Sequence, residues 1–92
     1  MGKIRIRTEI SGRVQGVCYR HFTQQSAGAH GVTGWVKNLG NGKVAALFEG
    51  EELAVTRVLN ECRQGPPAAE VNHMEIVAEE FSGEFDSFTI LR

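Results

Sequence analysis

The sequence has neither a surplus of one charge nor a long hydrophobic run. Its 10 Lys and Arg residues stand against 11 Asp and Glu residues, which gives a formal net charge of −1. Because proteins that bind nucleic acids neutralise phosphates with a basic surplus, this balance argues against a nucleic-acid partner. Polar and apolar side chains alternate over residues 1–10, so we expect neither a signal peptide nor a membrane span.

Cysteine and histidine are also scarce. The two cysteines, Cys18 and Cys62, accompany no export signal and therefore predict free thiols and a cytoplasmic location, although a bridge between them under oxidation stays open. The three histidines, His21, His30 and His73, are scattered without the spacing of metal ligands. We therefore expect no metal and no cofactor.

What the sequence does contain is a clear periodic pattern within 92 residues, a length that predicts one domain over 1–92 and a monomer. The pattern predicts strands over 4–10, 32–38, 43–49 and 71–80, helices over 19–30 and 52–64, and a short further strand over 88–90. The order β-α-β-β-α-β is typical of the α+β ferredoxin-like split βαβ sandwich. In that fold an antiparallel-dominated sheet carries two helices on one face. We expect Met74, Ile76 and Ala78 of the fourth strand to face inward.

The pair Asn41-Gly42 lies between two β-rich runs. Both residues accept positive φ, so the pair predicts a hairpin turn that joins the second and third strands. The first two strands are joined through a helix and therefore run in the same direction. This arrangement places the connection over 12–19, the start of the first helix and Asn38 at one edge of the sheet.

This edge is the candidate functional site. In a turn between a strand and a helix, successive backbone N–H groups can point into one concavity, and the positive end of the helix dipole adds to it. Arg20 follows in the first helical turn, where its planar guanidinium can bind two phosphate oxygens. On the residues alone, two plainer alternatives stay open. Gly12 and Gly16 can build a tight turn beside a solvated Arg20, and Asn38 can be a turn former.

Two sequence blocks carry a family resemblance. Residues 12–20 (GRVQGVCYR) resemble the first signature of the acylphosphatases, G-x-V-Q-G-V-x-F-R. Residues 31–38 (GVTGWVKN), followed by GKV at 42–44, resemble the second, G-x-x-G-W-V-R/K-N-x-x-D-G-x-V. The family has the ferredoxin-like fold that the periodicity predicts independently.

The resemblance implies roles by position. Arg20 matches the arginine that binds the phosphate, and Asn38 matches the asparagine that orients the attacking water. The residues that match the substrate-binding backbone cradle are Gln15, Gly16, Val17, Cys18 and Tyr19. Tyr19 stands where the family usually has Phe, so its hydroxyl needs a partner, and Asn41 replaces an Asp that builds the same type of turn.

The resemblance also implies the reaction, in which an acyl phosphate and water give a carboxylate and inorganic phosphate without a metal. Phosphoryl transfer depends mainly on positioning and charge stabilisation, which suits a site with few chemical groups. The expected partners are a small-molecule acyl phosphate and, as a site ligand, inorganic phosphate or sulfate.

Two other functions remain as alternatives. Cys18 could serve as the nucleophile of a cysteine-dependent phosphatase, but only Tyr19 separates it from Arg20, whereas such enzymes place the arginine well downstream. A non-catalytic module of the same fold could bind an anion without turnover. Trp35 is interpreted as a packing residue on its strand.

Overall fold

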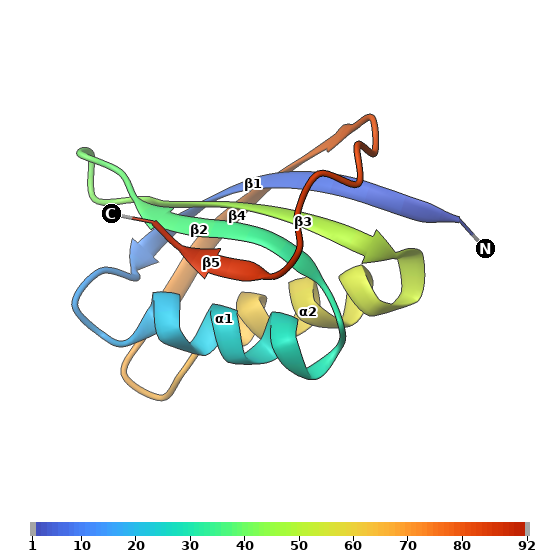
Figure 1. The fold of residues 1–92 in the computed structure, drawn as a ribbon. Helices are drawn as coiled ribbons and strands as arrows, with labels where there is room; N and C mark the ends of the chain where they lie inside the picture. The colour runs from blue at the N-terminus through green and yellow to red at the C-terminus, as the bar shows by residue number, and fades with distance from the viewer. Residues whose placement is uncertain (1, 92) are drawn as a thin grey trace.

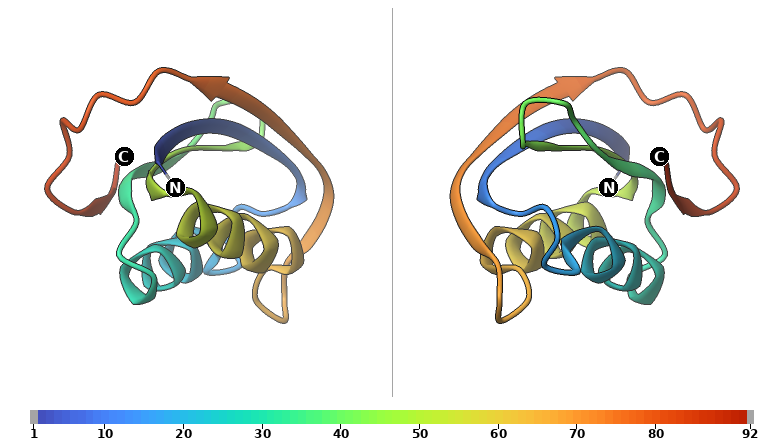
Figure 2. Two further views of the ribbon diagram at one scale, coloured as in Figure 1. Left: turned by 90° about the vertical axis from the view of Figure 1, so that its right-hand side faces the viewer. Right: turned by 90° about the vertical axis from the view of Figure 1, so that its left-hand side faces the viewer.

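The computed structural model describes residues 2–91, and these form one sheet covered by two helices (Figure 1). The elements are β1 (Lys3–Arg13), α1 (Tyr19–Ala29), β2 (Thr33–Asn38), β3 (Val44–Glu51), α2 (Glu52–Gln64), β4 (Glu70–Glu79) and β5 (Phe88–Ile90). The strand order in the sheet is β4-β1-β3-β2-β5, in which only the β2–β5 pair is parallel. Both helices lie on one face of the sheet (Figure 2). The predicted ferredoxin-like arrangement is confirmed.

Strand β1 shows why the alternating pattern of the sequence specifies this sheet. Ile6, Thr8 and Ile10 are buried on the face toward the helices, whereas Arg5 and Arg7 point to the other face. β1 pairs with β3 on one side and β4 on the other. Because it is an interior strand, its apolar face contributes to the core along most of its length.

The helices bury the stripes that their spacing predicts. In α2, Val55, Val58, Leu59 and Cys62 are buried at i, i+3, i+4 and i+7. α1 buries Tyr19, Thr23, Ser26 and Ala27. Of the helices within residues 2–91, none has the length and apolar character needed to cross a membrane.

Strand β4 departs from the expected burial. Met74 is buried, but Ile76 is 42% exposed and Ala78 is also exposed. β4 is an edge strand, and its second half curves away from the helices (Figure 2). Ile76 and Ala78 pair with Thr8 and Ile6, so they face the helix side as predicted. They are nevertheless exposed, because no helix of the described chain lies over that part of the strand (Figure 2).

A β-bulge at the end of β1 turns the chain toward the candidate site. The β1–β4 register shifts between Ser11 and Gly12, and the strand continues to Arg13, beyond the predicted end at residue 10. Gly12 has a φ of 125°, and a Cβ there would lie 2.1 Å from the carbonyl oxygen of Glu70. Only glycine fits this close approach between the two strands.

The turn between β2 and β3 is longer than the two-residue hairpin that Asn41-Gly42 suggested. Gly42 has a φ of 89°, but Asn41 does not adopt positive φ. Instead, the Asn41 side-chain Oδ1 accepts a hydrogen bond from the Lys43 N–H at 3.0 Å, and the Leu39 N–H donates to the Lys43 carbonyl at 2.8 Å. The connection over 39–43 is thus closed by an Asx-type bond and a single left-handed glycine.

Candidate active site

A pocket of about 190 Å³ lies where β1 and β2 end and α1 begins. In Figure 1 the β1–α1 connection and the β2–β3 turn lie at the same end of the molecule. The lining residues come from the loop, the first turn of α1 and the ends of β2 and β5; they are Val14, Gly16, Cys18, Tyr19, Arg20, His21, Asn38 and Ile90. The structure therefore brings Arg20 and Asn38 to one pocket, as the strand directions predict.

The loop before α1 has a left-handed backbone at two positions. Gly16 has a φ of 74° and Cys18, the residue before the helix, a φ of 63°. The Phe22 N–H makes a helical bond to the Cys18 carbonyl at 3.0 Å. The N–H groups of the first helical turn have no helical acceptor, and no side chain within residues 2–91 caps them at Cys18. The positive end of α1 therefore faces the pocket wall, where an anion is favoured.

Arg20 is held loosely at this wall. Its Nη1 donates to the Leu91 carbonyl at 3.3 Å, which is long for a charge-assisted bond. A guanidinium carries five N–H donors, and this is its one side-chain hydrogen bond within the described part of the chain. Most of its donors therefore stay available for an anionic ligand.

Asn38 contributes an acceptor that no protein group uses. Its Oδ1 atom is buried, and none of the groups in residues 2–91 donates to it. A buried polar atom left unpaired costs about 1–3 kcal/mol, and such atoms are rare enough that each calls for an explanation.

Of the five predicted cradle residues before Arg20, Gly16, Cys18 and Tyr19 line the pocket and two do not. The side chains of Gln15 and Val17 do not line the pocket: Val17 packs against the core, and Gln15 binds the β2–β3 turn. The sequence-based prediction for these two residues concerned their backbone N–H groups rather than their side chains. Sequence reasoning missed three lining residues, Val14, His21 and Ile90. Val14 lies within the first signature block and His21 directly follows Arg20, and these positions are the signals that could have identified the two residues.

Tyr19 shows how this chain accommodates its departure from the family motif. The side chain is 1% exposed, and its hydroxyl donates to the Cys62 carbonyl at 2.7 Å. Burial raises the pKa of Tyr19, so the hydroxyl stays protonated. The extra oxygen thus has the partner that it needs, in the core and not in the pocket.

The two cysteines lie in different surroundings. Cys18 is exposed at the pocket, and Cys62 is buried; both are free thiols, and burial raises the pKa of Cys62 to about 11.

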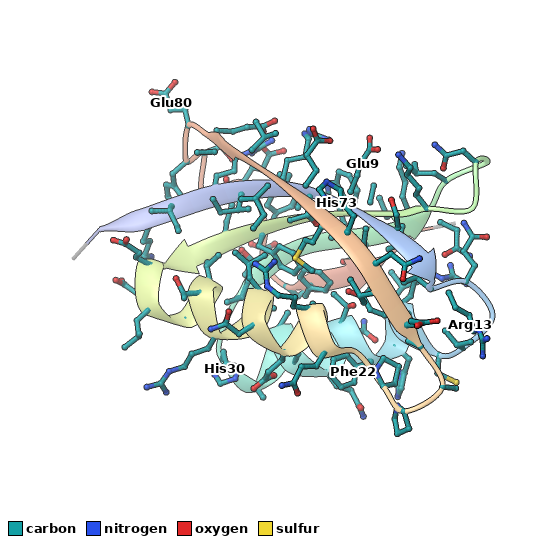
Figure 3. All side chains as sticks on the ribbon, turned by 180° about the vertical axis from the view of Figure 1, so that it is seen from behind. Glu9, Arg13, Phe22, His30, His73 and Glu80 are labelled. Carbon is teal, nitrogen blue, oxygen red and sulfur yellow. The ribbon has the colours of Figure 1, made fainter. Side chains whose placement is uncertain are left out.

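Trp35 is not a pocket residue: the Arg7 guanidinium and the Lys37 ammonium lie 5.7 Å and 5.4 Å from its ring centroid. Figure 3 places His30 beside the helices and His73 on β4, on separate elements.

The opposite end of the sheet holds a buried carboxylate. Glu49 is 1% exposed, and it accepts hydrogen bonds from the Arg5 guanidinium at 3.1 Å, from the Ser82 N–H at 2.9 Å and hydroxyl at 3.0 Å, and from the Gly83 N–H at 3.1 Å. Burial alone would raise the pKa of the Glu49 carboxyl, but these bonds together hold it below its usual value. Glu49 therefore fixes the segment between β4 and β5 to β3.

Fold and site together define an α+β sandwich of the ferredoxin-like class, with a pocket that combines a helix N-terminus, an arginine and an unpaired asparagine oxygen. The acylphosphatase family model matches residues 6–90. Acylphosphatases of Geotalea uraniireducens and Geobacter sulfurreducens are 52% and 48% identical to this chain, each over 96% of it and 97% of the relative. The crystal structure of acylphosphatase from Bacillus subtilis superposes with a TM-score of 0.93 at 31% identity, covering 97% of this chain and 99% of that one. The chain belongs to the acylphosphatase family, which confirms the prediction from the two signature blocks.

Proposed function

We propose that this enzyme hydrolyses acyl phosphates without a metal ion, with Arg20 and the loop amides binding the phosphate and Asn38 orienting the attacking water. The observation that carries the proposal is the unpaired, buried Oδ1 of Asn38 in the same pocket as Arg20 and the α1 N-terminus. A phosphate bound to the arginine and the amides would place its phosphorus close to a water that donates to this oxygen.

The reaction needs no further catalytic group. The water oxygen forms a bond to phosphorus while the bond from phosphorus to the acyl oxygen breaks, and the electron pair leaves with the carboxylate. The water's proton passes to an oxygen of the phosphoryl group. A carboxylate leaves readily at neutral pH, so the site requires positioning and charge stabilisation rather than a general acid.

The remaining substrate contacts come from the backbone. The cradle that we propose is formed by N–H groups over Gln15–Arg20, where Gly16 and Cys18 have positive φ and α1 begins. Such N–H groups stabilise charge that develops on the transferred group. Inorganic phosphate, the product, and sulfate would bind to the same groups.

The wider setting that we propose is a cytoplasmic monomer that acts on small acyl phosphates and binds neither membrane nor nucleic acid. The near-balanced net charge of −1 supports a small-molecule substrate over a nucleic acid, and the two free thiols support a reducing compartment. Added EDTA should leave turnover unchanged.

The experiment that tests the proposal is the substitution Asn38→Ala, assayed with a chromogenic acyl phosphate. We expect kcat to fall about 10²-fold with KM changed less than about threefold, because the lost interaction orients water rather than substrate. Asn60→Ala, at an exposed position of α2, is the matched control. Full activity of Asn38→Ala would refute the role of Asn38. Phosphate binding without turnover by the unaltered protein would instead indicate an anion-binding module.

A further inference from the structure

The side chain of Gln15 connects the two walls of the pocket. Its Nε2 donates two hydrogen bonds, to the Leu39 carbonyl at 2.8 Å and to the Lys43 carbonyl at 2.8 Å. Both acceptors are main-chain oxygens that can only accept, so the orientation of the amide is fixed by its partners. Few side chains can donate two bonds at once from a neutral group.

The two acceptors flank the turn that follows Asn38. The Leu39 N–H also donates to the Lys43 carbonyl at 2.8 Å, and the Gly42 N–H donates to the Leu39 carbonyl at 3.3 Å. The Gln15 amide therefore binds the two residues where the turn begins and ends, Leu39 and Lys43. Leu39 directly follows Asn38 in the chain. Within residues 2–91, these two bonds are the side-chain hydrogen bonds that tie the β1–α1 loop to the β2–β3 turn.

On the loop side, Gln15 lies between Val14 and Gly16. Val14 is 1% exposed and anchored in the core, and Gly16 has a φ of 74°; both line the pocket. The buried valine shares the core with Val36 of β2, and α1 packs against β2, so apolar contacts hold the general position of the loop. The amide of Gln15 adds directional hydrogen bonds to the turn that follows β2, a strand that β1 itself does not contact because β3 lies between them.

We propose that Gln15 is a positioning residue that sets the distance and angle between the phosphate cradle and the Asn38 carboxamide. This inference rests on the proposed function of Asn38 and Arg20. In-line attack requires reacting atoms near 3–3.5 Å apart, and a misplacement of about 1 Å can cost as much as 10²-fold in rate. A loop free to shift against the turn would still bind phosphate, but it would hold the phosphorus out of line with the water.

The test compares Gln15→Met, which keeps the length of the side chain but loses both donors, with the unaltered enzyme. We expect kcat to fall about tenfold, while the inhibition constant of inorganic phosphate changes less than about threefold. Gln25→Met, at an exposed position of α1, is the matched control and should retain kcat. Gln15→Asn keeps an amide that is too short to reach both carbonyls, and it should show the same pattern if Gln15→Met fails to fold.

A double-mutant cycle with Asn38→Ala separates positioning from simple stabilisation. If Gln15 acts through Asn38, Gln15→Met should lower kcat no further in the Asn38→Ala background. A lower melting temperature with kcat unchanged at 25 °C, or equal losses in both backgrounds, would overturn the inference. If Asn38→Ala alone keeps full activity, the proposed function fails instead, and the two failures are thereby distinguished.

Discussion

The buried polar groups at the two ends of the sheet differ in whether protein groups satisfy their hydrogen bonds. At the amino-terminal end of β1, the Glu49 carboxylate accepts four hydrogen bonds and is satisfied by the protein itself. At the carboxyl-terminal end, the Asn38 Oδ1 has no protein donor in the described chain, and Arg20 makes one long bond. A satisfied group stabilises the fold, whereas an unsatisfied one is stabilised only when a ligand arrives. Of the two buried side-chain atoms without a partner in residues 2–91, Thr8 Oγ1 and Asn38 Oδ1, the second belongs to a residue that lines the pocket.

Arg20→Ala should have the largest effect, and it tests the end of the sheet where Arg20 makes one long bond and the Asn38 Oδ1 lacks a protein donor within residues 2–91. We expect kcat/KM for an acyl phosphate to fall at least about 10³-fold, because both charge and bidentate binding are lost. Arg20→Lys should recover only part of the loss, since an ammonium does not match two phosphate oxygens. Steady-state kinetics measures both. Equal activity of the lysine variant would show that charge alone suffices.

Glu49→Gln tests the opposite end of the sheet, where protein groups satisfy the buried carboxylate. The amide cannot accept from all the donors that surround Glu49, so we expect the free energy of unfolding to fall by about 2–4 kcal/mol, measured by urea denaturation. The kcat of the folded variant should stay unchanged, because Glu49 lies at the other end of the sheet. A loss of kcat without a loss of stability would erase the contrast between the ends.

The same carboxylate predicts a pH dependence. The pKa of Glu49 in the folded protein lies below its ordinary value of 4.5, so its stabilisation is complete above that pH and is lost as the pH falls through the lowered value. Unfolding free energies measured between pH 7 and pH 3 should therefore fall more steeply for the unaltered protein than for Glu49→Gln. Parallel curves would contradict a carboxylate held ionised by its neighbours.

Tyr19→Phe should have a smaller effect, confined to stability. The variant restores the usual family residue but leaves the Cys62 carbonyl, near the end of α2, without the hydroxyl that it accepts from. We expect a loss of about 1 kcal/mol in the free energy of unfolding, seen as a lower thermal midpoint. Higher stability would mean that the buried hydroxyl costs more to desolvate than its hydrogen bond returns.

Cys18→Ala should have the smallest effect. The thiol lines the pocket, but the proposed attack comes from water, so we expect kcat to change less than about threefold. Assay of the variant with an acyl phosphate decides the matter. An inactive variant would favour the cysteine-dependent phosphatase over a water-based mechanism.

Most of the fold follows from the sequence because its signals are local. The alternation of Ile4, Ile6, Thr8 and Ile10 specifies a half-buried strand, and the spacing over 52–64 specifies an amphipathic helix that the structure has with the same bounds. Ile76 faces the helix side as predicted but stays 42% exposed, because periodicity gives the direction of a side chain but not whether another element covers it.

Part of the candidate site could likewise be predicted from the sequence, and part could not. The convergence of Arg20 and Asn38 follows from strand direction, which the order of elements determines. The bonds of Gln15 to the turn and of Glu49 to Ser82 do not follow, because each joins residues far apart in the sequence through a side chain whose direction only tertiary packing sets. Ile90 was missed because an apolar pocket wall has the same composition as a core.

The interior place of β1, between β4 and β3, has a consequence for how the chain folds. Arg5 bonds to Glu79 across a sequence separation of 74 residues, and Ile6 pairs with Phe48 on the other side. Neither flank of β1 can form until a long stretch of chain has closed on itself, and the entropy of that closure is lost before any contact compensates for it. A domain with so many distant pairings should fold slowly for its size, in milliseconds to seconds.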